Sequence, residues 1–239
     1  MDLLRPTLML AVICSLGGSA LAADAFDKHA CNVTLLQAKS VQKELGITET
    51  QRAKMNVHAD RNNAQGMEID RLVSSNKITI ADATIRVGRL RSELKKRVVG
   101  ELNSAQIIRL REISLQQAGA LALLDPVVGT KIGMSKAQTD LIRAKYVEHN
   151  AQAQKIKGDA FGPIDEKYKR MKPANEEEAR KLQEQFVTER TAKQKEILPK
   201  LIALATEFDK AVEAVMTKGQ IESYKKLKGK VFKPKTGSE

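Results

Sequence analysis

Apolar residues recur every three or four positions along most of this chain, which is the spacing of one face of an α-helix. In 80–102 these positions are Ile80, Ala83, Val87, Leu90, Leu94, Val98 and Leu102. A second run contains Leu182, Phe186, Ile197, Leu201, Leu204, Phe208, Val212 and Val215, with a kink expected at Pro199. Residues 28–44 predict a lead-in helix that ends at Gly46. The pattern predicts an all-α fold of long helical hairpins.

Four short phrases mark expected helix starts: ITETQ, LNSAQ, MSKAQ and MTKGQ. Each has a cap residue followed three positions later by glutamine, giving the pairs Thr48 and Gln51, Asn103 and Gln106, Ser135 and Gln138, and Thr217 and Gln220. In such a capping box the cap side chain accepts from the N3 amide, while glutamine reaches back to the cap's own amide. A further box is expected at Asn175 and Glu178.

The order of the phrases predicts an internal duplication. In the first and third, glycine stands ahead of the apolar residue, as in LGITETQ and IGMSKAQ, whereas the second and fourth read LNSAQIIRL and MTKGQIESY. Each unit is therefore expected to be a hairpin followed by a short third helix. The second unit is longer, and we expect its extra residues near 157–180, where Gly162-Pro163 and Lys172-Pro173 predict breaks.

The first residues have the features of a secretory signal. Arg5 precedes the apolar run LMLAVICSLGGSALA, and the small residues Ala20 and Ala22 predict cleavage between Ala22 and Ala23. A retained anchor is the alternative, but the run is too short to span a bilayer. We therefore expect an exported, periplasmic protein with a signal peptide at 1–22, a first helical unit at 23–125 and a second at 126–239. The second unit is expected to end in a flexible basic tail.

Composition favours thin amphipathic helices over a β-fold. Tryptophan is absent and aromatic residues make up 3% of the chain, while hydrophobic residues reach 42% and charged residues 29%. The formal net charge is +12, so the protein is expected to attract acidic polypeptides, other polyanions or anionic membrane surfaces.

Residues with catalytic or metal-binding potential are few. The chain contains no GxxxxGK[ST] loop, no GxSxG elbow and no HExxH motif, so no enzyme activity and no cofactor are expected. His29 and Cys31 would supply two metal ligands, but no second close pair completes a set, and His58 and His149 occupy unrelated places. Cys31 is alone in the mature chain. It either pairs between chains or is a buried small hydrophobe, the commoner fate.

One stretch is strongly basic. RVGRLRSELKKR places six cations, with only Glu93 against them, on one helix, and we expect these residues to steer clients: Arg86, Arg89, Arg91, Lys95, Lys96 and Arg97. A solvated helix face is the alternative interpretation. Nucleic-acid binding is disfavoured because side chains that stack on bases are nearly missing.

The four phrases resemble the LTxxQ motif of the Spy/CpxP-like family of exported helical stress proteins, although none has the leucine-threonine pair. The resemblance implies a small all-α cradle that holds unfolded or damaged envelope proteins without ATP. An envelope stress- or metal-sensing interaction protein is the alternative. Family members carry two motifs per chain and form the cradle as dimers.

The expected partners are therefore unfolded or acidic client proteins, or an envelope stress sensor, with no nucleic acid and no stable membrane insertion. Four motifs in one chain predict a monomer with pseudo-symmetric halves, a dimer being the alternative.

Overall fold

A computed structural model describes residues 22–234, which contain nine α-helices, two short 3₁₀ segments and no strand. The all-α prediction is therefore confirmed. In chain order the elements are α1 (Ala25–Ala30), η1 (Val33–Gln37), α2 (Lys39–Glu44), α3 (Glu49–Ser74), α4 (Ile80–Gly100), α5 (Ser104–Ala118), η2 (Gly119–Leu124), α6 (Pro126–Lys131), α7 (Lys136–Lys169), α8 (Glu176–Glu213) and α9 (Lys218–Lys228). The predicted signal sequence up to residue 21 and the last part of the basic tail, 235–239, lie outside the described residues.

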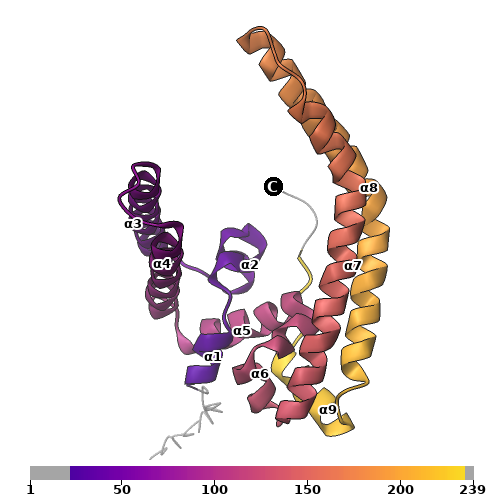
Figure 1. Cartoon of the computed structure of the whole chain (residues 1–239). Helices are drawn as coiled ribbons and strands as arrows, with labels where there is room; N and C mark the ends of the chain where they lie inside the picture. The colour runs from indigo at the N-terminus through magenta and orange to yellow at the C-terminus, as the bar shows by residue number, and fades with distance from the viewer. Residues whose placement is uncertain (1–21, 235–239) are drawn as a thin grey trace, which may run out of the picture.

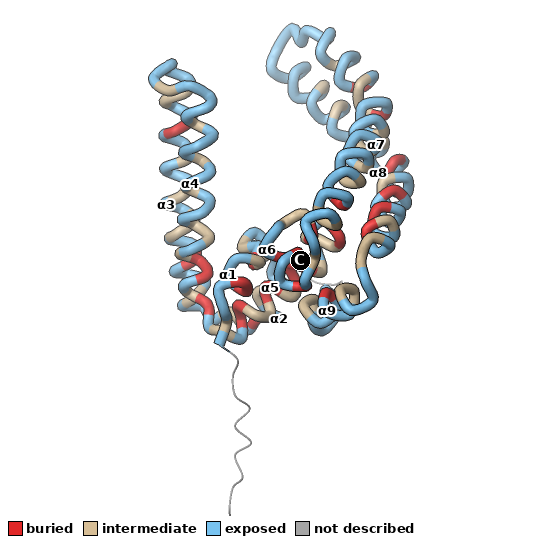
Figure 2. Tube along the Cα trace, turned by 60° about the horizontal axis from the view of Figure 1, so that its bottom comes forward, coloured by how far each residue is buried: buried red, intermediate tan, exposed pale blue. Residues whose placement is uncertain are grey.

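Two helical hairpins dominate the shape of the molecule. α3 packs along α4, and α7 packs along α8. Both hairpins rise from a base that contains α1, α5, α6 and α9, and they diverge from each other above it (Figure 1). The view turned by 60° shows the same separation and shows that most of the hairpin surface is exposed (Figure 2).

Capping boxes begin the principal helices, as the sequence predicts. All four expected boxes form, at the starts of α3, α5, α7 and α9. The box at Asn175 forms only in part: the Asn175 side chain accepts from the Glu178 amide at 2.9 Å, but the Glu178 carboxylate accepts from the Ala174 amide at 2.6 Å. A box of Thr79 and Asp82 at the start of α4 was not predicted.

The second hairpin is longer because its helices extend further from the base. α7 has 34 residues and α8 has 38, against 26 in α3 and 21 in α4. The loop between α7 and α8 lies inside the predicted insertion, 157–180, and contains Lys172-Pro173. The predicted break at Gly162-Pro163 is wrong, because α7 continues through it. Buried Ala160 and Ile164 flank the proline, so packing of this segment offsets the lost backbone hydrogen bond.

α8 likewise runs through Pro199 without ending, and the α7–α8 hairpin curves along its length (Figure 1).

The single lead-in helix predicted for 28–44 is also wrong. The segment is divided into α1, η1 and α2. At the first division, the Asn32 backbone amide donates to the Ser114 hydroxyl at 2.8 Å, and the Asn32 side chain accepts from the Thr34 amide at 3.1 Å. Bonds to the distant α5 therefore replace the helical bonds that the periodicity predicted.

The buried side chains form two clusters that meet at the base. The first includes Leu110 and Ile113 of α5, and the second includes Ile142 of α7. Phe26 of α1 belongs to the second cluster, while Phe232, which follows α9, packs against the first. Each cluster is therefore in contact with side chains from both the first and the second half of the chain.

Polar contacts join the same elements. The buried guanidinium of Arg111 on α5 pairs with the Asp27 carboxylate of α1 at 3.0 Å and also donates to the Leu227 carbonyl of α9. The Tyr224 hydroxyl of α9 donates to the Gly119 carbonyl at 2.6 Å, and burial raises the pKa of this phenol. The base is therefore held by the beginning, the middle and the end of the chain.

Candidate functional site

The glutamines of the first two capping boxes bind each other. Gln51 Nε2 donates to Gln106 Oε1 at 2.8 Å, and Gln106 Nε2 donates to Gln51 Oε1 at 3.1 Å. These residues begin α3 and α5, so their contact joins the first helix of the hairpin to the helix that follows the hairpin.

The glutamines of the other two boxes form the same contact at the second hairpin. Gln138 Nε2 donates to Gln220 Oε1 at 2.8 Å, and Gln220 Nε2 donates to Gln138 Oε1 at 3.0 Å. We call each of these arrangements a glutamine clamp: Gln51 with Gln106, and Gln138 with Gln220. Each clamp closes the base of one hairpin.

Each glutamine also donates to the backbone near its partner's cap. The acceptors are the carbonyls of Glu101 for Gln51, Leu45 and Gly46 for Gln106, Val215 for Gln138, and Gly133 for Gln220. In every case a carbonyl two positions before the partner's cap residue accepts. The two clamps therefore have the same hydrogen-bond pattern.

This pattern requires an amide side chain. Each glutamine oxygen accepts from its own cap's backbone amide and from the partner glutamine. Each Nε2 donates both to the partner glutamine and to the backbone near the partner's cap. A glutamate would serve in a simple capping box, but it has no hydrogen to donate when ionised. Gly46 and Gly133 hold left-handed φ angles of 59° and 73°, which glycine adopts without strain, and this explains the glycine in two of the phrases.

Sequence reasoning identified these glutamines as helix caps but missed their pairing. The repeated order of the four phrases was the signal that could have predicted the pairing. One box begins the first helix of a hairpin and the next box follows its second helix, so both boxes lie at the same end of the hairpin.

The six basic residues of α4 do not gather on one face. Arg86 and Arg89 line a groove of about 490 Å³ against α3, whereas Lys95 and Lys96 line a different groove against α1 and α5. Since successive residues turn by about 100° around a helix, Arg91 lies on the side away from Arg86 and Arg89. Arg97 pairs with Glu93 at 3.4 Å. The structure therefore divides the expected client-steering residues between different sides of α4.

A small charged cluster lies at the end of α4, beside the first clamp. The Glu101 carboxylate contacts His58 Nε2 at 3.1 Å and Lys54 Nζ at 3.2 Å. The hydrogen bond from His58, together with that from Lys54, lowers the pKa of Glu101. The Glu101 carbonyl meanwhile accepts from Gln51, so the residue ties α3 to the end of α4 twice.

The other candidate ligands are separated. His29 Nε2 contacts Asp125 Oδ2 at 2.7 Å, while the buried Cys31 thiol donates to the Ile107 carbonyl at 3.3 Å. His149 stacks on Phe208 with 4.9 Å between ring centroids. Among residues 22–234 no group of three or more His, Cys, Asp and Glu side chains is placed to hold a metal ion. Of the alternatives for Cys31, the structure shows the buried one.

Large apolar side chains are exposed on both hairpins. On the first hairpin they are Val57, Met67, Ile80 and Ile85, and on the second they include Leu141, Val147, Val187, Leu198 and Ile202. The helices in the described part of the chain are each too short or too polar to cross a membrane.

No protein-family model, curated protein or solved structure matches this chain. The resemblance to the LTxxQ-motif family stays a prediction that rests on the four phrases.

Proposed function

We propose that this chain is an exported, ATP-independent binding protein of the holdase kind, which holds unfolded clients against its two hairpins. The observation that carries the proposal is the exposure of large apolar side chains on hairpins that stand apart from each other. Met67 is 73% exposed on α3, and Ile202 is 57% exposed on α8. Apolar side chains left in water on extended helices are suited to contact the apolar segments of an unfolded chain.

The charge of the protein supports the choice of client. The net charge is +12, and Arg86, Arg89 and Arg91 are all exposed on α4. Acidic polypeptides would be drawn to these cations, which lie on different sides of α4, before any apolar contact forms. We therefore propose that the preferred clients are unfolded and acidic.

The clamps support a monomer as the working form. Each of the four glutamines has its partner within the same chain, so both clamps close without a second copy. The loop from η2 to α6 keeps the two hairpins at a high effective concentration relative to each other. We propose that one chain forms the cradle that the resembled family forms from two. Light scattering at micromolar concentration is expected to give the monomer mass, and an obligate dimer would contradict this part of the proposal.

The test is an aggregation assay without ATP. The purified protein is added at increasing ratios to a reduced, acidic client, and light scattering follows the aggregation. We expect suppression that is complete near stoichiometric ratios. Unchanged aggregation at a stoichiometric ratio would contradict the proposal.

Paired variants locate the binding surface. The double variant Leu198→Ser with Ile202→Ser removes two exposed apolar side chains from α8, and Leu121→Ser with Val127→Ser removes two from the base. We expect the first to weaken client binding by about tenfold, because the lost contacts amount to about 1.4 kcal/mol. The second is the matched control and is expected to bind normally. If both variants lost client binding equally, the α7–α8 hairpin would not be the specific client-binding surface.

A further inference from the structure

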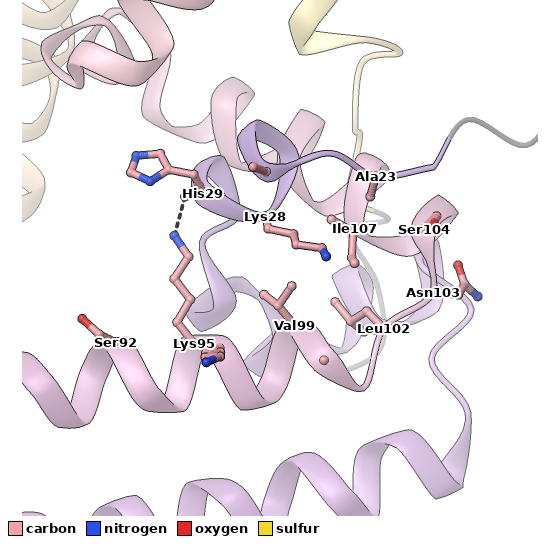
Figure 3. Close-up of a pocket in the computed structure, with 13 residues that line it drawn as sticks. Ala23, Lys28, His29, Ser92, Lys95, Val99, Leu102, Asn103, Ser104 and Ile107 are labelled. Carbon is pink, nitrogen blue, oxygen red and sulfur yellow. Dashed lines mark hydrogen bonds between the residues drawn. The ribbon is translucent and has the colours of Figure 1, made fainter.

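A groove opens between α1, α4 and the start of α5, and Figure 3 shows the residues that line it. Its volume is about 800 Å³, and sites for small molecules typically have about 300–1,000 Å³. The groove lies on the side of α4 that faces α1, away from the groove that Arg86 and Arg89 line. Its lining includes Lys95 and Lys96, two of the six residues that the sequence predicts to steer clients. It does not include the clamp glutamines or Arg86, Arg89 and Arg91, which support the proposed choice of client.

The walls of the groove are positively charged. Lys28 comes from α1 and Lys95 from α4, on facing walls (Figure 3). Lys96, the next residue of α4, also lines the groove. The Lys95 ammonium donates to the His29 backbone carbonyl, which is a neutral acceptor. Within residues 22–234 these three lysines form no ion pair with a carboxylate, whereas many other cations of the chain do.

The carboxylates on the surrounding elements are already engaged elsewhere. Asp24 pairs with Lys131 at 3.0 Å, Asp27 with Arg111 at 3.0 Å, Glu93 with Arg97 at 3.4 Å, Glu101 with Lys54 at 3.2 Å, and Glu112 with Arg109 at 2.7 Å, while Asp82 caps α4. Cations that share a groove repel one another. The groove therefore has an excess of positive charge that an anionic ligand would neutralise.

The floor of the same groove is apolar. Val99 of α4, Leu102 of the following loop and Ile107 of α5 line it, and all three are anchored in the first core cluster. Lys28 extends above this floor in Figure 3. The three floor side chains are only 5%, 7% and 4% exposed, and Ala23 and Ala25 add more accessible apolar surface to the same groove. An inorganic anion would neutralise the lysines but would make no contact with this apolar surface. A ligand with an anionic head and an apolar chain satisfies both parts.

We propose that this groove binds a single-chain anionic amphiphile of the fatty-acid class. Its carboxylate lies among Lys28, Lys95 and Lys96. Its alkyl chain lies along Ala23, Ala25 and the exposed parts of Val99, Leu102 and Ile107. The alkyl chain gains about 0.8 kcal/mol for each methylene that leaves water, and the head group gains charge-assisted hydrogen bonds from the ammonium groups. The inference is independent of the holdase proposal, because it uses a different surface and a different ligand.

Titration calorimetry of the purified full chain tests the ligand class. The probes are dodecanoate below its micelle concentration, hexanoate, dodecyl maltoside and inorganic phosphate. We expect one dodecanoate per chain, and we expect hexanoate to bind at least about tenfold more weakly because it buries fewer methylenes. If phosphate bound as tightly as dodecanoate, the groove would be a site for anions in general and not for an amphiphile. If dodecyl maltoside bound as tightly as dodecanoate, or if several dodecanoates bound per chain, the binding would be only apolar adsorption. Each of these results would overturn the proposal.

A charge-matched pair of variants tests the location. Lys28→Gln with Lys96→Gln removes two charges from the groove, and Lys39→Gln with Lys43→Gln removes two exposed charges from α2. We expect the groove variant to bind dodecanoate about tenfold more weakly and the α2 variant to bind as the unmodified protein does. All four lysines are half-buried or exposed, and a circular dichroism melt checks that both variants fold. Equal weakening in the two variants would assign the effect to net charge and overturn the site.

Discussion

The side-chain amides of Gln51 and Gln106 donate to each other, at 2.8 and 3.1 Å, although 55 residues separate them in the chain. The contact closes the base of the α3–α4 hairpin against the start of α5. Gln138 and Gln220 repeat it at the second hairpin, so the glutamine of each phrase serves two purposes: it caps its own helix and binds a partner helix.

Replacing Gln138 with glutamate separates these two purposes. A capping box accepts glutamate, and a negative charge at a helix N-terminus is favourable, so capping alone predicts a neutral or stabilising change. Because the clamp needs two donated hydrogen bonds from this side chain, we expect Gln138→Glu to destabilise by about 1–3 kcal/mol at pH 7. Urea unfolding measures the difference. Gln138→Ala is the control that removes both functions, and unchanged stability of the glutamate variant would show that the clamp contributes nothing.

The Arg111–Asp27 pair should be a principal support of the base. Replacing Arg111 with methionine leaves the Asp27 carboxylate buried without its cation, so we expect a loss of about 3 kcal/mol in the free energy of unfolding. The double variant Asp27→Leu with Arg111→Met removes both charges and should regain much of that loss. Thermal and urea denaturation provide the values. A double variant as unstable as the single one would argue against an unpaired charge as the cause.

The thiol of Cys31 should be unreactive in the folded protein. It is 3% exposed, and burial raises its pKa to about 12. Since the thiolate is the reactive form, we expect labelling by a disulfide reagent at pH 8 to be at least about a hundredfold slower than in denaturant. Absorbance of the released chromophore follows the reaction. Labelling at the denatured rate would show that α1 and α5 separate readily.

Glu101 should make stability sensitive to acid. Its pKa in the folded protein is lowered by the hydrogen bonds from His58 and Lys54, so the unfolded state takes up the proton first. Its contribution is therefore complete above the unfolded pKa, about 4.3, and is lost as the pH falls through the lower folded value. Unfolding curves between pH 6 and pH 3 should decline less steeply for Glu101→Gln than for the unmodified chain. If stability declined equally with falling pH in both proteins, Glu101 would not contribute to the acid sensitivity.

Charge reversal on α4 should slow client association. We expect Arg86→Glu with Arg89→Glu to lower the association rate of an acidic client by about tenfold at low salt, with a smaller change in dissociation. The difference should shrink as the Debye length falls to about 8 Å near physiological ionic strength. Stopped-flow fluorescence measures both rates. Lys39→Glu with Lys43→Glu is the matched control on α2, and an equal effect there would indicate that only net charge matters.

Local features of this structure follow from the sequence. The boxes at Thr48, Asn103, Ser135 and Thr217 form because each joins groups only three residues apart, whatever the rest of the chain does. The hairpins likewise follow from apolar positions at helical spacing, which bury one face of each helix. The same local reasoning failed at Pro163, where packing along α8 keeps α7 continuous.

Contacts between distant segments depended on the tertiary structure. The sequence alone did not place Gln51 beside Gln106, divide the cations of α4 between two grooves, or bring Lys28 opposite Lys95. Each of these arrangements requires helices from remote parts of the chain to pack at one angle and in one register. Packing of the two core clusters sets that register, and no pattern within a single helix specifies it.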